Sequence, residues 1–86
     1  MPQRLTDQQS ALLAILLAHI DEHGWAPTVR EIAAAGPWAS TSTVQHHLRV
    51  LDRKGVIVLG GGPRMVRVVD PDAVRRELDR ERPIDH

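Results

Sequence analysis

Hydrophobic residues recur at helical spacing in the first part of the chain. They form one wide stripe, made up of Leu12, Leu13, Ile15, Leu16, Leu17 and Ile20. Thr6 and Gln9 stand at the spacing of a capping box before this stripe, and Gly24 is a typical helix stop after it. The pattern therefore predicts a helix that ends at about His23. A stripe this wide packs against more than one neighbouring element.

A second, shorter helix is predicted between two loops. Thr28 and Glu31 form another capping box, and the Gly-Pro pair at 36–37 stops the helix after about Ala35. Trp38 follows this stop, and we expect it to pack into the turn rather than to stack on a nucleic-acid base.

A third helix, over 40–54, carries two contrasting faces. Ser40 is its expected N-cap and Gly55 its stop. A narrow apolar stripe is formed by Val44, Leu48 and Leu51. The opposite face has hydrogen-bonding and cationic groups and no carboxylate; its residues are Ser42, Thr43, Gln45, His46, Arg49 and Arg53.

The last part of the chain predicts a hairpin and one more helix. Strand-like runs at 56–59 and 64–69 flank a glycine-rich turn, which lacks the Lys-Ser/Thr pair and the following helix of a phosphate-binding loop. Asp70 is the expected cap of a helix over 71–82. The thin apolar edge of this helix consists of Val74 and Leu78.

The order helix, short helix, helix, hairpin, helix is typical of a winged helix-turn-helix. We therefore predict a mainly α fold with a small β-hairpin (α+β), built from a three-helix core, a wing over 56–69 and an added C-terminal helix. Residues 1–69 are assigned to the winged helix-turn-helix, and residues 70–86 to the last helix and a frayed tail.

Composition limits the possible functions. The chain has 86 residues and no cysteine, which excludes disulfides, thiolate metal sites and cysteine nucleophiles. A domain of this size leaves little room for a catalytic cleft, so we expect no enzyme activity and no catalytic residues. His19 and His23 could bind a metal as a pair, but no third ligand follows from the spacing. We expect no metal and no cofactor.

We expect neither a membrane span nor a secretory signal. No apolar run is long enough to span a bilayer, and the first residues lack the apolar stretch of a secretory signal. We expect a cytoplasmic protein without a membrane partner, and the absence of cysteine suits that compartment.

The net charge is zero, but the charges are unevenly distributed. Residues 40–69 contain five basic residues and one acidic residue, whereas residues 1–39 and 70–86 each contain more acids than bases. Because the local field decides whether a phosphate backbone is attracted, this basic segment favours a nucleic-acid partner. The alternative is an ordinary solvated surface.

The third helix and the hairpin carry the residues predicted to contact double-stranded DNA. Base edges in the major groove are read by hydrogen-bonding side chains, here Ser40, Ser42, Thr43, Gln45 and His46. The residues predicted to contact phosphates, or to enter the minor groove from the wing, are Thr28, Arg49, Arg53, Lys54, Arg64 and Arg67.

One such domain binds weakly, so we expect a homodimer on paired half-sites. The dimer contact stays open at this point. It could be the last helix, which would otherwise cover the first helix, or it could be Ile15 or Leu17 of the first helix.

Several short motifs resemble one known family. They are Leu5-Thr6, Gln9, Gly24, Pro27-Thr28, Glu31-Ile32-Ala33, Ser40, His47-Leu48, Leu51 and Arg53-Lys54-Gly55-Val56-Ile57, continued by Arg64 and Arg67. In this combination, residues 5–69 resemble the N-terminal DNA-binding domain of the LexA repressor family. The resemblance implies a winged helix-turn-helix that binds double-stranded DNA and regulates transcription.

The chain departs from that family in the third helix. Thr41, Ser42, Gln45 and His46 stand where LexA proteins usually carry a proline, an asparagine and paired acids. The family's operator is therefore not carried over. We expect no peptidase domain, and Lys54 is the only lysine, so the resemblance does not imply self-cleavage.

The sequence thus predicts a sequence-specific, repressor-like DNA-binding regulator. The alternative is a winged helix that serves as a protein-protein interaction module, because the fold alone does not select the function. Such a module more often exposes apolar anchors on its contact face. The polar outer face of the third helix favours DNA.

Overall fold

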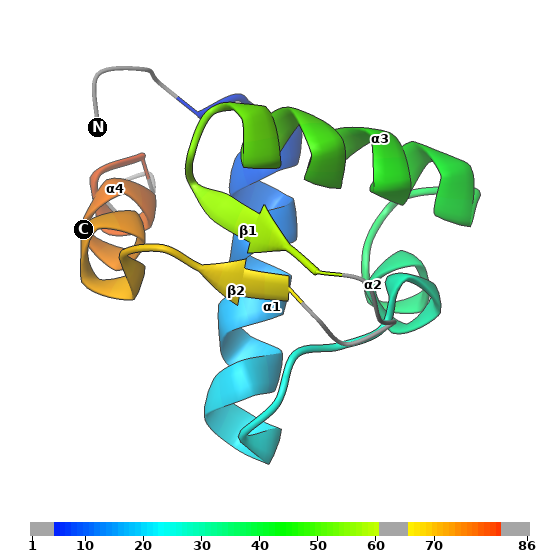
Figure 1. Cartoon of the computed structure of the whole chain (residues 1–86), viewed down its shortest axis with the longest axis horizontal. Helices are drawn as coiled ribbons and strands as arrows, with labels where there is room; N and C mark the ends of the chain where they lie inside the picture. Colours follow the sequence, from blue (N-terminus) through cyan, green and yellow to red (C-terminus); the bar gives the residue numbers. More distant parts are fainter. Residues whose placement is uncertain (1–4, 61–65, 82–86) are drawn as a thin grey trace, which may run out of the picture.

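The structure, a computed structural model, describes residues 5–60 and 66–81. Its elements are α1 (Asp7–His23), α2 (Val29–Ala35), α3 (Thr41–Arg53), β1 (Ile57–Leu59), β2 (Val66–Val68) and α4 (Pro71–Glu81). In Figure 1, α1 runs behind the hairpin, α3 lies above the hairpin, and α2 and α4 lie at opposite sides. This arrangement confirms the predicted α+β class and the winged helix-turn-helix.

The helices begin and end where local signals predicted. Thr6 Oγ1 accepts a hydrogen bond from the backbone N–H of Gln9 (3.1 Å), and Gln9 Oε1 accepts one from that of Thr6 (3.0 Å). Thr28 and Glu31 make the same exchange at the start of α2 (3.1 and 2.8 Å). Gly24 ends α1 with a left-handed φ of 85°. These bonds satisfy N–H groups that have no partner in the first turn of a helix.

The core is mostly aliphatic and is centred on α1, which packs against α2, α3 and α4. Its fully buried side chains include Leu12, Leu13, Leu16, Ile32, Leu51, Ile57 and Val74. Leu17 is buried as well and Ile15 is partly buried against the same core, so the wide stripe is used within the fold. Trp38 is 7% exposed, and its Nε1 donates to Gln8 Oε1 over 2.7 Å, which confirms that it packs into the turn.

The hairpin is antiparallel and shorter than predicted. Ile57 pairs with Val68 and Leu59 with Val66. Val56 lies just outside β1: its carbonyl still accepts the N–H of Val69 across the hairpin (3.0 Å), but its own N–H donates to Leu51 O at the end of α3 (3.1 Å). The predicted start of the second strand, at 64–65, lies outside the described residues.

The last helix covers α1. The carboxylate of Asp70 caps α4 by accepting from the N–H of Ala73 (3.1 Å), as predicted. Val74 is 1% exposed, and Arg75 makes two hydrogen bonds to Asp21 of α1 (2.8 and 2.9 Å). Of the two roles that the sequence left open for this helix, the structure shows the intramolecular one.

None of the helices in the described part of the chain combines the length and the apolar character that a membrane crossing requires.

Candidate nucleic-acid interface

The two faces of α3 separate as the helical period demands. Val44, Leu48 and Leu51 are at most 2% exposed. All five residues predicted to read bases are exposed, namely Ser40, Ser42, Thr43, Gln45 and His46. The only acidic residue of α3 is Asp52, which lies in its last turn. The structure therefore brings the predicted base readers to one end of α3, outside its buried stripe.

Two of these five residues are engaged in capping the helix. Ser40 Oγ accepts a hydrogen bond from the backbone N–H of Thr43 (3.4 Å) and lies 3.3 Å from Thr43 Oγ1. In the part of the chain that the structure describes, Ser42 and Gln45 make no hydrogen bond through their side chains. Their donors and acceptors are therefore available to a ligand, whereas Ser40 and Thr43 also hold the helix start.

His46 stands beside a small group of rings. Its ring centroid lies 5.7 Å from that of His47, which in turn lies 6.2 Å from that of Trp38. His46 is exposed, whereas His47, which lies beside the core stripe, is half-buried. Of the two histidines, His46 is therefore the one available to a base.

The cations predicted to contact phosphates do not all lie together. Arg49 and Arg53 are exposed one turn apart on α3. Arg67 is exposed on β2, where it lines a separate hollow beside Trp25 at the end of α1. Arg64 lies outside the described residues. The structure therefore unites the two α3 arginines and places Arg67 elsewhere on the surface.

Lys54 has a structural contact that sequence reasoning did not predict. It is partly buried, and its Nζ donates a hydrogen bond to Gln9 Oε1 over 3.0 Å. Gln9 is only 5% exposed and belongs to the capping box of α1. One N–H of the ammonium group is thus committed to the fold, and two remain for other acceptors.

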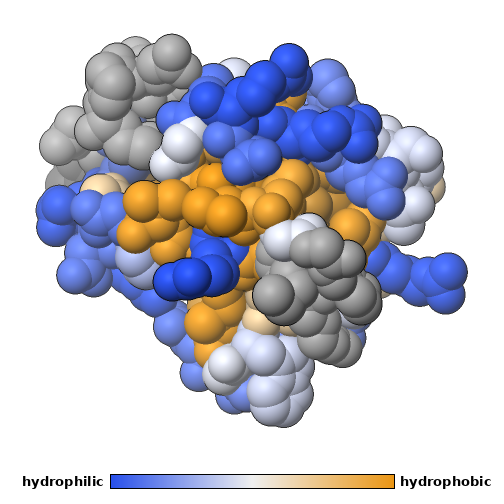
Figure 2. Space-filling model, in the orientation of Figure 1, coloured by the Kyte–Doolittle hydropathy of each residue, from blue (hydrophilic) through white to orange (hydrophobic). Residues whose placement is uncertain are grey.

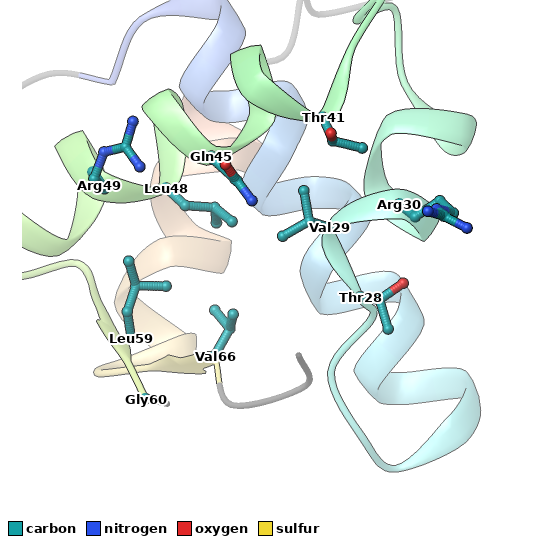
Figure 3. A pocket seen from close by; sticks show the side chains of 10 residues that line it. All are labelled: Thr28, Val29, Arg30, Thr41, Gln45, Leu48, Arg49, Leu59, Gly60 and Val66. Atoms are coloured by element: carbon teal, nitrogen blue, oxygen red, sulfur yellow. The ribbon is translucent and has the colours of Figure 1, made fainter. Parts of the chain in front are cut away.

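A groove of about 470 Å³ separates α3 from the hairpin and from the start of α2. We call it the α3–hairpin groove; it is lined by Thr28, Val29, Arg30, Thr41, Gln45, Leu48, Arg49, Leu59, Gly60 and Val66. Figure 3 shows four aliphatic side chains pointing toward its centre, with the amide of Gln45 reaching in from α3. Figure 2 shows the same region as a hydrophobic surface below the hydrophilic surface of α3. No carboxylate is among these described lining residues.

The groove adds two residues that sequence reasoning missed. Arg30 and Thr41 are exposed and line it beside the predicted residues Thr28 and Gln45. Arg30 stands two positions after Thr28, and this adjacency was the one sequence signal for it. The space between α2 and the hairpin is created by tertiary packing and is not visible in the sequence.

The histidines of α1 have partners within the fold. His19 Nδ1 lies 3.0 Å from the backbone oxygen of Trp25, and its Nε2 lies 3.8 Å from Glu31 Oε1. Over residues 5–60 and 66–81, no three His, Asp or Glu side chains are grouped as metal ligands.

Comparison with known proteins decides the family. A family model described as the LexA DNA binding domain matches residues 2–64. The chain belongs to this family. The match confirms the resemblance that the motifs between Leu5 and Ile57 carried.

Curated LexA repressors show the same similarity. The LexA repressor of Frankia alni is 40% identical over 76 residues, which cover 87% of this chain and 30% of that protein. That of Bifidobacterium longum (strain DJO10A) is 42% identical over 74 residues, 85% of this chain and 31% of the relative. That of Limosilactobacillus fermentum is 44% identical over 57 residues, 66% and 27% respectively. The chain therefore spans about 30% of the length of the LexA repressors it matches.

Proposed function

We propose that this chain is a sequence-specific, repressor-like regulator of transcription that places α3 in the major groove of double-stranded DNA. The observation that carries the proposal is the composition of the exposed face of α3. Polar side chains in its N-terminal half are followed by Arg49 and Arg53, and the only carboxylate of the helix is that of Asp52 in its last turn. A helix of this kind fits the major groove and matches the donors and acceptors of base edges. Membership of the LexA DNA-binding domain family supports the same function.

Sequence preference is assigned to the N-terminal half of α3. The amide of Gln45 carries a donor and an acceptor side by side, which suits the major-groove edge of adenine. Ser42 and His46 add a hydroxyl and an imidazole on the exposed side. Ser40 and Thr43 lie at the same end, where their capping bonds limit the directions in which they can reach a base.

Backbone contacts are assigned to the surrounding cations and to one hydroxyl. Arg49 and Arg53 follow the base readers along α3, and Lys54 keeps two N–H groups beyond its bond to Gln9. The hydroxyl of Thr28 accepts from the N–H of Glu31, which leaves its own proton for a phosphate oxygen. Arg64 and Arg67 are assigned to the wing, where Arg67 lies apart from the two arginines of α3. These contacts fix the register on the duplex without specifying its sequence.

A single domain of this size presents one recognition helix, so we propose that two copies bind paired half-sites. The apolar edge of α4 is used against α1. The contact between copies is therefore assigned to other surfaces. The proposal places the chain in the cytoplasm, where bacterial DNA lies, and it involves no catalytic residue and no cofactor.

The test is binding to fluorescent duplexes, first of random sequence at low and moderate salt and then from a pool selected for affinity. We expect salt-sensitive binding to random duplex and enrichment of one sequence in the selected pool. Undetectable binding at low salt would overturn the proposal and would favour the protein-interaction module. Binding without any enriched sequence would overturn its sequence-specific part.

A further inference from the structure

The α3–hairpin groove lies between the two elements that the proposed function assigns to DNA. A helix in the major groove and a wing at the neighbouring minor groove are separated by one sugar-phosphate strand. That strand has to pass over the surface between α3 and the hairpin. In this protein, that surface is a hollow rather than a ridge.

The chemistry of the groove matches the two parts of a nucleic-acid strand. Its floor is made of aliphatic side chains, which are Val29, Leu48, Leu59 and Val66. Deoxyribose presents C–H groups that pack on such a floor, whereas phosphates need cations and hydroxyl donors. The polar side chains of the lining come from α2 and α3, and no carboxylate is found among the lining residues that the structure describes.

Two arginines stand on different walls of the groove. Arg49 belongs to α3 and Arg30 to α2, and Figure 3 shows them at opposite edges of the groove. Both are exposed, and neither makes an ion pair or hydrogen bond within residues 5–60 and 66–81. Arg75 of α4 provides the contrast, because its guanidinium is held by two hydrogen bonds to Asp21.

We propose that one DNA strand crosses the α3–hairpin groove and is held by Arg30 and Arg49 through phosphates at its two edges, while the deoxyribose units between those phosphates rest on the aliphatic floor. The inference depends on the proposed function and adds Arg30 as a positioning residue that contacts no base. The proposal accounts for the absence of carboxylates among the described lining residues of the groove, because a negative charge there would repel the DNA strand. It also explains why an exposed arginine on α2 belongs to the same surface as the predicted readers on α3.

The test uses the full chain and one selected duplex in which single phosphates are replaced by neutral methylphosphonates. We expect Arg30→Ala to weaken binding several-fold for selected and random duplex alike, and to lower the salt slope by about one. Neutralising a phosphate that Arg30 contacts should weaken binding of the unaltered chain but not of Arg30→Ala. The same should hold for a second phosphate and Arg49→Ala, and both phosphates should lie on the same strand. Arg30→Lys should restore part of the affinity.

The matched control is Arg76→Ala, which removes an exposed arginine from α4, away from the groove. Circular dichroism and thermal unfolding verify that each variant keeps the fold. The inference is overturned if Arg30→Ala binds like Arg76→Ala, or if the two sensitive phosphates lie on opposite strands. Failure of the unmodified chain to bind any duplex overturns the proposed function, and the inference falls with it.

Discussion

The ammonium group of Lys54, at the end of α3, donates a hydrogen bond to Gln9 Oε1 in the first turn of α1 over 3.0 Å. The same oxygen accepts a hydrogen bond from the backbone N–H of Thr6. It therefore takes part both in the capping box of α1 and in a contact between two residues that lie 45 positions apart in the chain. Because Gln9 is 5% exposed, few other donors can reach it. The end of the proposed recognition helix is thereby tied to the start of the central helix.

This contact predicts a stabilising role for Lys54 that is separate from any DNA contact. We expect Lys54→Met, which keeps the aliphatic stem, to lower the free energy of unfolding by about 1–2 kcal/mol, because a charged donor to a nearly buried acceptor is lost. Arg53→Met at the neighbouring exposed position should change it by no more than about 0.5 kcal/mol. Urea unfolding of both variants measures the difference, and equal effects would contradict the structural role.

The polar face of α3 predicts two kinds of binding variant. Gln45→Ala should relax the preference at one base pair by about 1–3 kcal/mol, because a two-bond contact with a base is lost. Arg49→Ala should instead weaken binding to all sequences alike and lower the salt slope by about one. For the unaltered chain, roughly four to five phosphate contacts give a slope of about −4. Competition with singly substituted duplexes checks this, and an unchanged preference in Gln45→Ala would rule out α3 as the reader.

Gly36 is restricted by space rather than by backbone conformation. Its φ is −116°, which any residue can adopt, but a Cβ would overlap the ring of Trp38 and approach Ile15 Cδ1 at 3.0 Å. We expect Gly36→Ala to displace the ring, break its bond to Gln8 and cost about 1–3 kcal/mol of unfolding free energy.

The measurement for Gly36→Ala combines thermal unfolding with tryptophan emission. A Trp25→Phe background leaves Trp38 as the single fluorophore, because the chain has two tryptophans. A shift of the emission to longer wavelength should accompany the lower stability. Unchanged stability together with unchanged emission would contradict the predicted overlap between the new Cβ and the ring of Trp38.

The Asp21–Arg75 pair predicts a pH-dependent term in stability. The hydrogen bonds from Arg75, helped by its charge and opposed by desolvation, hold the pKa of Asp21 below its ordinary value. The pair therefore stabilises the fold above the unfolded-state pKa of about 4, and this contribution is lost as the pH falls through the lowered folded-state pKa.

Asp21→Asn tests this term. The variant should be slightly less stable than the unaltered chain at neutral pH and equally stable in acid, with a small difference because the pair is solvent-exposed and screened. Thermal unfolding at low salt across the acid range provides the comparison. A stability gap that persists in strong acid would contradict the ion pair as its cause.

Local sequence signals accounted for most of the fold. The capping boxes at Thr6 and Thr28, the cap at Ser40 and the left-handed glycine at 24 place the helix ends correctly, because each acts within a few residues of itself. The same holds for the exposed face of α3, which follows from helical period alone. Val56 was predicted to belong to the first strand but lies just outside it, because its N–H bonds to Leu51, and that bond depends on how α3 and the strand meet.

The sequence by itself determined the order and type of the elements, the aliphatic core and the polar face of α3, since these depend on periodicity and on neighbouring residues. Only the tertiary structure decided that Lys54 is bonded to Gln9, that α4 covers α1, and that Arg30 lines a groove with Arg49. Each of these contacts joins residues far apart in the chain. Their geometry is set by how whole elements pack, and no local pattern records that packing.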